Sequence, residues 1–260
     1  ISLRKLKKAT NKFSNDRQIG EGRSAHVFRG ILRNGQVVAV KRLKPGADRD
    51  ADYDGEVGVL SRLSHPNIIR LIGFCAHKDT ERIIVYEFMP LRTLYDLLHA
   101  GEQALDWDMR MRIGAGVAKG LSYLHNGANP RVIYRDLKPS NVLLDQYYHP
   151  KISDFGIAIS VPADAQSSTV TVTELMGTHP YWAPEHALAD RLSSKSDVYS
   201  FGVLLLEIIA GTVPLDARRP RYVADWVTLL ISLKTITVFS FLFFFLNPAS
   251  CIIIVLYGLR

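Results

Sequence analysis

One short segment of this 260-residue chain carries the side chains that phosphoryl transfer requires. Asp136 provides a carboxylate that can accept or orient the proton of a hydroxyl, and Lys138 provides a cation that can neutralise phosphate charge. Asn141 and Asp154 provide amide and carboxylate oxygens, the kind of ligand that Mg²⁺ prefers. Each residue alone is an ordinary turn residue, but their order and spacing together predict phosphoryl-transfer chemistry.

A second group of residues, nearer the N-terminus, predicts a place for phosphates. At residues 20–27 (GEGRSAHV), small residues between two predicted strands would let backbone amides approach phosphates closely. Taken alone, this run is explained equally well by a bare hairpin turn. Lys41 lies on the next predicted strand, and a buried lysine needs a counter-charge to stay extended and protonated. Glu56 fits that role better than Asp54, because it lies four residues before Leu60 on the inward face of the following predicted helix.

The surrounding pattern predicts a β-rich region followed by an α-rich region. Between residues 13 and 87 the sequence alternates or carries β-branched residues, and Asn34-Gly35 marks a tight hairpin turn. Strands are predicted at residues 18–20, 25–30 and 36–42, and one helix at residues 52–63. Beyond a linker near residues 87–92 the apolar spacing is helical, most clearly at residues 93–99, 106–126 and 196–210.

Composition limits the classes of protein. Hydrophobic residues make up 47% of the chain and charged residues 22%, as in globular proteins rather than disordered or fibrous ones. Two distant cysteines, Cys75 and Cys251, and the lack of an Asn-x-Ser/Thr acceptor favour a reducing, cytoplasmic setting. The formal net charge is +7, but the lysines and arginines are dispersed and no nucleic-acid motif accompanies them. We therefore expect no nucleic-acid partner.

In this order, the motifs resemble those of protein kinases. The similar parts are the glycine-rich loop, the strand that ends at Lys41, the Arg-Asp catalytic loop and the Asp-Phe-Gly motif at residues 154–156. The segments LKKATNKFS (6–14), VYEFM (85–89) and NPRVIYRD (129–136) look like plant receptor-like kinases, and the Tyr-Arg-Asp form resembles their cytoplasmic Ser/Thr branch most closely. The resemblance covers about residues 3–226. Three residues depart from the pattern. Ala25 stands in place of the third glycine of the loop, Tyr134 stands in place of a histidine, and Pro180 stands in place of a glycine.

The resemblance implies an α+β, bilobal protein-kinase fold. The kinase domain would occupy residues 15–226. Its β-rich small lobe, with one helix, would cover about residues 15–88, and its α-rich large lobe, which would be truncated, about residues 89–226. Residues 1–14 would be a flanking segment, and residues 227–260 an atypical apolar tail.

The resemblance also implies residue roles. Asp136 and Lys138 would be catalytic, with Lys41 on the α- and β-phosphates and Glu56 as its partner. Asn141 and Asp154 would hold Mg²⁺, or Mn²⁺ in its place. ATP would be bound by Ile19, Gly20, Gly22, Val27, Ala39, Lys41, Tyr86, Glu87, Met89 and Leu143. Tyrosine kinases usually place Ala or Arg where Lys138 stands, so protein Ser/Thr hydroxyls are the implied substrates.

Other residues would support this centre by resemblance. Asp197 would hold the backbone of the catalytic loop, and Thr178 would hydrogen-bond near Asp136 and Lys138. An apolar column would join the two lobes through Leu60, Leu71, Tyr134 and Phe155. Arg135 could pair with a phosphorylated activation loop, whose candidate sites are Ser167, Ser168, Thr169, Thr171 and Thr173.

Both ends of the chain leave alternatives open. Residues 1–13 combine five cations with helical spacing of apolar residues, which indicates either a solvated helix face or a surface for anionic lipid. Residues 235–257 are uncharged over about the length of a bilayer span, although Asn247-Pro248 interrupts them, and they are an anchor, a packed segment or an aberrant terminus. The family pairs Glu185 with an arginine of its last helices, so we expect a buried carboxylate without its counter-charge.

The sequence thus predicts an ATP- and Mg²⁺-dependent Ser/Thr protein kinase that acts on protein substrates in receptor-linked signalling, with an upstream receptor kinase as a partner. The incomplete large lobe and Pro180 keep a second hypothesis open, which is a kinase-fold scaffold with little or no catalytic activity. We expect a cytoplasmic location. The inner face of the plasma membrane is the alternative if the apolar tail or a segment before Ile1 binds membrane.

Overall fold

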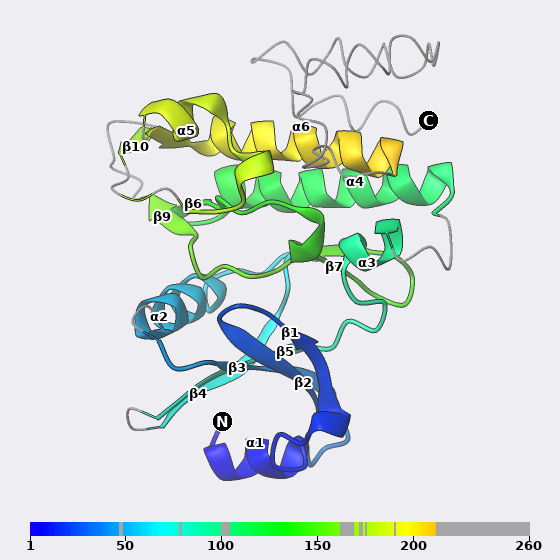
Figure 1. The fold of residues 1–260 in the computed structure, drawn as a ribbon, viewed down its shortest axis with the longest axis vertical. Coiled ribbons are helices and arrows are strands. Elements are labelled where there is room, and N and C mark those ends of the chain that lie inside the picture. The colour runs from blue at the N-terminus through cyan, green and yellow to red at the C-terminus, as the bar shows by residue number, and fades with distance from the viewer. Residues whose placement is uncertain are drawn as a thin grey trace.

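The computed structural model describes residues 1–46, 49–77, 80–99, 105–161, 169–171, 174, 176–189 and 191–211. Two lobes follow one another along the long axis of the molecule, with a β-sheet in the lower lobe and helices in the upper one (Figure 1). This arrangement confirms the predicted α+β, bilobal fold. The apolar tail at residues 227–260 lies outside the described residues.

The small lobe is built on a five-stranded antiparallel sheet with the strand order β1-β2-β3-β5-β4. The strands are β1 (Gln18–Glu21), β2 (Ala25–Ile31), β3 (Val37–Leu43), β4 (Leu71–His77) and β5 (Glu81–Glu87). The predicted hairpin turn is confirmed between β2 and β3, where Gly35 adopts a φ of 83° and the Asn34 side chain accepts a hydrogen bond from the Gln36 N–H. Glycine suits this position because other residues rarely adopt a positive φ.

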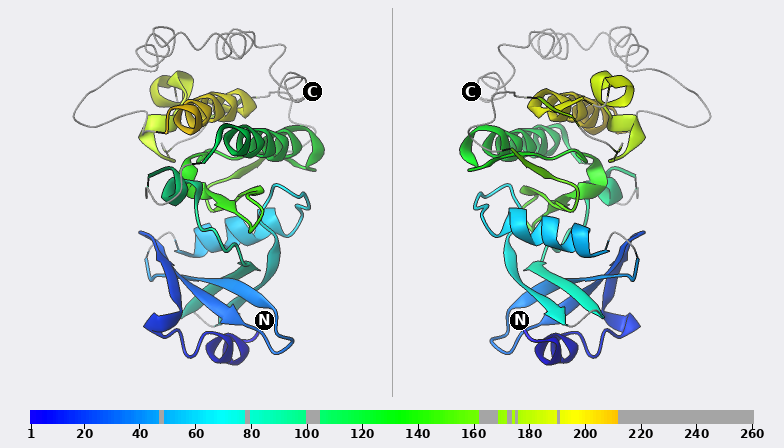
Figure 2. Two further views of the ribbon diagram at one scale, coloured as in Figure 1. Left: turned by 90° about the vertical axis from the view of Figure 1, so that its right-hand side faces the viewer. Right: turned by 90° about the vertical axis from the view of Figure 1, so that its left-hand side faces the viewer.

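Alternate side chains of β5 enter two separate apolar clusters. Ile83 and Val85 lie on one face of the sheet, where Leu6 of α1 (Leu3–Ala9) is fully buried among them. Ile84 lies on the other face, with α2 (Arg49–Leu60) and the large lobe. The two helices therefore cover opposite faces of the sheet (Figure 2). The α2 helix begins and ends three residues earlier than the predicted helix at residues 52–63.

The large lobe is mainly helical, and its two longest helices lie side by side (Figure 1). Its helices are α3 (Leu94–His99), α4 (Trp107–Ser122), the π-helical turn η2 (Tyr123–Gly127), α5 (Pro184–Ala189) and α6 (Ser194–Ala210), with short 3₁₀ turns η3 (Pro139–Asn141) and η4 (His179–Tyr181). Ser193 and Ser196 form a reciprocal cap at the start of α6, and Gly211 ends that helix. The predicted helices at residues 93–99, 106–126 and 196–210 are confirmed to within a few residues.

Short strand pairs connect the helices and carry the loops between them. They are β6 (Arg131–Ile133) with β9 (Ile159–Val161), β7 (Val142–Leu144) with β8 (Pro150–Ile152), and β10 (Thr169–Thr171) with β11 (Arg191–Ser193). The 3₁₀ turn η1 (Asn15–Arg17) connects the end of the first helical segment to β1. Within the described ranges, no helix is long and apolar enough to cross a membrane.

One apolar cluster joins the two lobes. Leu60 of the small lobe and Tyr134 and Phe155 of the large lobe are buried in it, and Leu71 packs against it. The rings of Tyr134 and Phe155 meet edge to face with centroids 5.1 Å apart, a favourable aromatic geometry. The predicted apolar column is thus confirmed, and two of its members, Tyr134 and Phe155, belong to the loops that carry the candidate site.

Candidate active site

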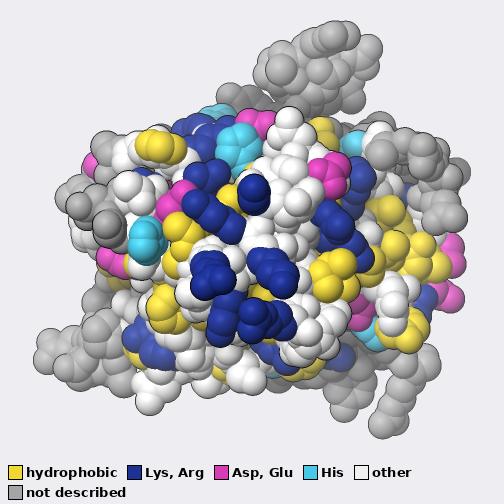
Figure 3. All heavy atoms as spheres, turned by 90° about the horizontal axis from the view of Figure 1, so that it is seen from below, with side chains coloured by type: hydrophobic (Ala, Val, Ile, Leu, Met, Phe, Trp, Pro, Cys, Tyr) yellow, Lys and Arg dark blue, Asp and Glu magenta, His cyan; other side chains and the backbone are white. Residues whose placement is uncertain are grey.

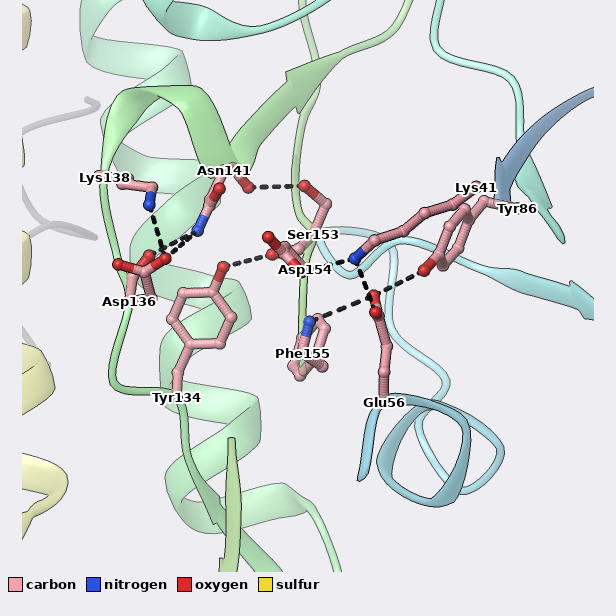
Figure 4. Close-up of polar contacts among 10 residues, drawn as sticks. All are labelled: Lys41, Glu56, Tyr86, Tyr134, Asp136, Lys138, Asn141, Ser153, Asp154 and Phe155. Atoms are coloured by element: carbon pink, nitrogen blue, oxygen red, sulfur yellow. Dashed lines mark hydrogen bonds and ion pairs between the residues drawn. The ribbon is translucent and has the colours of Figure 1, made fainter. Parts of the chain in front are cut away.

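The segment that runs from the end of β6 through η3 brings Asp136, Lys138 and Asn141 together (Figure 4), and Thr178, just before η4, joins them. Lys138 Nζ lies 2.7 Å from Asp136 Oδ2 and 2.8 Å from Thr178 Oγ1, and the Thr178 hydroxyl donates to Asp136 Oδ1 at 2.7 Å. The Asn141 amide donates to the backbone carbonyl of Asp136 and to its Oδ2, both at 2.9 Å. The predicted hydrogen bonds of Thr178 are confirmed, and Asp136 is held in one orientation by three neighbours.

Asp197, at the start of α6, fixes the backbone of this loop. Its carboxylate accepts the N–H groups of Tyr134 and Arg135, both at 2.8 Å, and also contacts His125 Nε2 at 2.7 Å. This confirms the predicted role of Asp197. Arg135 has a φ of 75°, an unfavourable conformation for a non-glycine residue, and such strain persists only where the surroundings impose it. The buried Asp197 carboxylate provides that restraint one residue before Asp136.

A second set of charges lies where the small lobe meets the large one. Lys41 of β3 is 2.8 Å from Glu56 of α2 and 2.8 Å from Asp154, and the Tyr86 hydroxyl donates to the other oxygen of Glu56 at 2.6 Å (Figure 4). Lys41 therefore pairs with Glu56, as predicted, rather than with Asp54. The Phe155 N–H also donates to Glu56, at 3.3 Å. One buried carboxylate thus ties β3, β5 and the Asp154 segment together.

Burial and opposite charges act against each other in this set. Burial opposes the positive charge of Lys41, but the carboxylates of Asp154 and Glu56 together raise its pKa above the ordinary lysine value. Burial raises the pKa of the Glu56 carboxyl, and the Lys41 ammonium opposes that rise. The same ammonium holds the pKa of the Asp154 carboxyl below its usual value. Lys41 stays protonated, as contact with phosphate would require.

The Asp154 segment approaches α2 very closely. A Cβ atom on Gly55 would lie 3.2 Å from the carbonyl oxygen of Gly156, so the glycine that weakens the helix also lets it approach this loop. Asp154 itself has a φ of 61°. On the other side, the fully buried Tyr134 donates its hydroxyl to the carbonyl of Ser153. Burial raises the pKa of this phenol well above its usual value, which keeps the donor proton in place.

The predicted nucleotide residues come from neighbouring strands. Across the sheet Gly20 pairs with Val27, Val27 with Lys41, and Ala39 with Tyr86. Leu143 bridges to Thr93 in the large lobe, and Met89 is buried between the lobes in the shared cluster. Ile19 of β1 is 39% exposed, and Gly22 donates its N–H to the Ala25 carbonyl. At the end of β5, the Glu87 carboxylate accepts the Arg70 N–H and pairs with Lys151. Their contact with ATP stays a prediction.

The oxygen donors predicted for Mg²⁺ are held near one another by backbone contacts. Ser153, next to Asp154, donates its N–H and its hydroxyl to the Asn141 carbonyl at 2.9 and 3.0 Å. Within the described residues, no cluster of three or more His, Cys, Asp or Glu side chains could hold a metal alone. One amide and one carboxylate suit Mg²⁺ that takes its other ligands from water and nucleotide phosphates. The donor set therefore fits a nucleotide-bound Mg²⁺.

A buried polar network supports the segment after Thr178. Glu207 of α6 is fully buried and accepts the Tyr181 hydroxyl at 2.6 Å, and its other oxygen lies 2.9 Å from His99 Nε2. Burial raises the pKa of the Glu207 carboxyl, and the hydrogen bonds to Tyr181 and His99 oppose that shift. Sequence reasoning missed this network and His125, although a lone acid inside the apolar run of α6 was the available signal.

One expectation about the same region stays open and another changes. The Pro180 backbone lies in the first turn of η4, where a helix needs no N–H donor, so its missing N–H is compatible with the local structure. Its effect on the binding of a peptide substrate stays a prediction. The expected burial of Glu185 is wrong, because this residue is exposed and accepts a hydrogen bond from Ser196 at 3.1 Å. Of the candidate activation-loop hydroxyls, Thr169 and Thr171 lie in β10, whereas Ser167, Ser168 and Thr173 lie outside the described residues.

The two-lobed fold and the charged groups at its junction define a protein-kinase domain. The sequence model of the protein kinase domain matches residues 13–236, most of the chain. The chain therefore belongs to the protein kinase family.

Its curated relatives are plant kinases. The chain is 50% identical to the serine/threonine-protein kinase PBS1 of Arabidopsis thaliana over 226 residues, which are 85% of this chain and 49% of the relative. It is 48% identical to CDG1, another serine/threonine-protein kinase of that plant (87% and 54% covered), and 43% identical to the proline-rich receptor-like protein kinase PERK2 (89% and 32%). The chain thus spans about half or less of these relatives, and the resemblance to plant receptor-like kinases is confirmed.

Proposed function

We propose that this chain is a Ser/Thr protein kinase that transfers the γ-phosphoryl group of ATP, with Mg²⁺, to protein hydroxyls. The observation that carries the proposal is the contact of Thr178 with Asp136. A threonine hydroxyl lies 2.7 Å from a carboxylate whose other oxygen is paired with Lys138. A substrate hydroxyl needs the same acceptor beside the same cation.

The residues can be assigned to the steps of this reaction. Asp136 orients the substrate hydroxyl and takes its proton as the oxygen attacks the γ-phosphorus, while the bond to the β-phosphate oxygen breaks and ADP leaves. Lys138 neutralises the charge that develops on the transferring group. Lys41, kept charged and extended by Glu56, holds the α- and β-phosphates. Mg²⁺, held by Asn141 and Asp154, would neutralise phosphate charge.

The proposal predicts that transfer depends on the Asp136 carboxylate. Full-length protein is incubated with labelled ATP, Mg²⁺ and a generic basic protein substrate, beside Asp136→Asn. The variant should lose at least about a hundredfold in rate, the scale of one general base. Asp16→Asn is the matched control, because Asp16 is exposed and pairs with its sequence neighbour Arg17, far from the catalytic loop in the sequence. Label should appear on Ser and Thr, and EDTA should abolish it.

Equal incorporation by wild type and Asp136→Asn would refute the enzymatic assignment. Nucleotide binding without transfer would leave the kinase-fold scaffold as the function. Replacing Mg²⁺ by Mn²⁺ in the same assay tests whether the predicted oxygen ligands accept either cation.

We also propose that an upstream receptor kinase controls this chain by phosphorylating its activation segment. Support comes from Arg135, whose buried Nε atom has no hydrogen-bond partner in the part of the chain that is described. Among the described residues, its other nitrogens donate to the carbonyls of Ile157 and Glu174, at 3.4 and 3.2 Å. A phosphate would give the guanidinium a better partner. Activity that is unchanged by phosphorylation of the segment, or by Arg135→Gln in the phosphorylated protein, would oppose this.

The proposed domain boundaries, residues 15–226 with the tail at 227–260, are testable by expressing the chain with and without the tail. Equal amounts of folded, active protein from both would support them.

A further inference from the structure

The far end of the small lobe carries a concentrated positive surface that the proposed reaction does not use. Figure 3 looks at this end and shows Lys and Arg side chains gathered at its centre. A hollow of about 710 Å³ lies here, and its charged lining residues are Arg4, Lys7, Lys8, Lys12, Arg42 and Glu81. Five cations and one carboxylate give the lining a net formal charge of +4. We call these six residues the basic end face.

The single carboxylate of this surface is already neutralised. Arg42 binds Glu81 through two hydrogen bonds of 2.8 and 2.6 Å, and its guanidinium stacks over the Phe13 ring at 4.8 Å. Arg4, Lys7, Lys8 and Lys12 are exposed and have no carboxylate partner among the residues that the structure describes. Their four charges face solvent uncompensated.

The fold holds these cations in place despite their mutual repulsion. Arg4 lies three and four residues before Lys7 and Lys8, the spacings at which like charges destabilise a helix. The seven-residue helix α1 is too short to be stable alone, and the burial of Leu6 in the sheet holds it. Repulsive charges on a helix that is fixed in this way indicate a surface suited to an anionic ligand.

The turn after α1 adds Lys12 to the same surface. Asn11, Lys12 and Phe13 all have positive φ angles, of 50°, 60° and 59°. The buried Thr10 hydroxyl accepts the Phe13 N–H at 3.1 Å, and the Lys12 N–H donates to the Lys7 carbonyl at 2.6 Å. These bonds fold the chain back, so Lys12 lines the same hollow as Lys7 and Lys8.

We propose that the basic end face binds anionic membrane lipid, with a phosphoinositide headgroup in the hollow. The patch lies at the end of the molecule remote from the large lobe (Figures 1 and 2), so a flat bilayer could contact it while Asp136 stays open to a protein substrate. Lysines dominate the free charges, and their flexible ammonium groups suit a layer of lipid phosphates. Phosphopeptide readers instead rely on clusters of arginine forks, and here Arg42 is already occupied.

Vesicle sedimentation of the full-length protein tests this proposal. Vesicles contain neutral phosphatidylcholine alone, or with phosphatidylserine or phosphatidylinositol bisphosphate at matched charge. The patch variant carries Lys7→Gln, Lys8→Gln and Lys12→Gln. The matched control carries Arg112→Gln, Lys119→Gln and Arg191→Gln, three exposed cations of the large lobe. Both variants have the same net charge and keep the apolar tail, so a tail that inserts would affect all samples equally.

The wild type should prefer vesicles with phosphatidylinositol bisphosphate. The patch variant should bind them on the order of a hundredfold more weakly, because each of the three lysines contributes about fivefold. The control should change by less than about threefold, and high salt should remove the preference. Equal losses in the two variants, equal binding to neutral vesicles, or binding of an acidic phosphopeptide without a preference for anionic vesicles would each overturn the proposal. Unchanged thermal unfolding of both variants shows that they remain folded.

Discussion

Tyr134→Phe isolates one hydrogen bond at the centre of the site. Tyr134 stands where related kinases have histidine, and its hydroxyl donates to the carbonyl of Ser153, directly before Asp154. Phenylalanine keeps the buried ring and its edge-to-face contact with Phe155 at 5.1 Å, so only the hydroxyl is removed. Any loss therefore measures how strongly this bond holds the Asp154 segment.

The size of the effect follows from burial. Tyr134 has no exposed surface, so water cannot replace its hydroxyl as a donor to the Ser153 carbonyl. A neutral hydrogen bond contributes about 1 kcal/mol net, and an unsatisfied buried acceptor costs about 1–3 kcal/mol. We expect Tyr134→Phe to lower the free energy of unfolding by about 2 kcal/mol. A looser Asp154 should also raise the KM for Mg-ATP more than it lowers kcat, by about three- to tenfold.

Urea unfolding and steady-state kinetics measure the two effects. Tyr147→Phe provides the control, because it removes the same hydroxyl from a side chain that is 65% exposed, and it should change stability by less than about 0.5 kcal/mol. If Tyr134→Phe matches wild type in both assays, the hydroxyl does not hold the Asp154 segment and the reasoning is wrong. A loss of stability with unchanged KM would separate packing from positioning.

Three further substitutions test other contacts. Gly55→Ala should stabilise α2 through helix propensity. It should nevertheless lower kinase activity several-fold at unchanged ATP concentration, because the new Cβ would lie 3.2 Å from the Gly156 carbonyl oxygen. Full activity in a kinase assay would contradict this. Asp197→Asn replaces one of the two oxygens that accept the buried loop N–H groups with a donor, and it should lower the free energy of unfolding in urea by about 2–4 kcal/mol. An unchanged free energy would show that the loop does not need this carboxylate. Burial would raise the pKa of Asp145, but hydrogen bonds from the His149 and Tyr147 backbones and the His149 side chain outweigh it and lower this pKa below its usual 3.8. The Asp145 carboxylate therefore stabilises the folded protein fully above pH 3.8, and this contribution is lost as the pH falls through the lower pKa of the folded state. Acid titration of stability below about pH 4 should therefore be shallower in Asp145→Asn, and identical curves would refute the contribution.

Local signals allowed much of the site to be predicted from the sequence. Asp136, Lys138 and Asn141 lie within one loop, so their spacing along the chain nearly sets their spacing in space. The Asn34-Gly35 turn was likewise predictable, because its positive φ restricts the residue type. The ends of α2 were not, because Gly55 and Gly58 weaken the helical signal while contacts with the Asp154 segment, invisible in sequence, fix where the helix lies.

The buried polar partners could not be predicted in this way. His125 and Asp197 are separated by 72 residues, and His99 and Glu207 by 108. A polar residue in an apolar helix shows that some partner must exist, because burial without one is costly, but its partner depends on how distant segments pack. The same limit applies to the basic end face. The spacing of apolar residues within residues 1–13 predicted a helix with a charged face, but only the fold shows that Arg42 of β3 lies beside that face.

The α6 helix links the two halves of the large-lobe site. Asp197 near its start binds the backbone before Asp136, and Glu207 near its end binds the Tyr181 side chain in the segment that follows Thr178. Ser200, between them, donates to the Tyr181 carbonyl at 2.7 Å. Because one helix holds both segments, the Thr178–Asp136 contact depends on residues up to 207. The catalytic loop thus takes part of its support from α6, which favours a kinase over a scaffold.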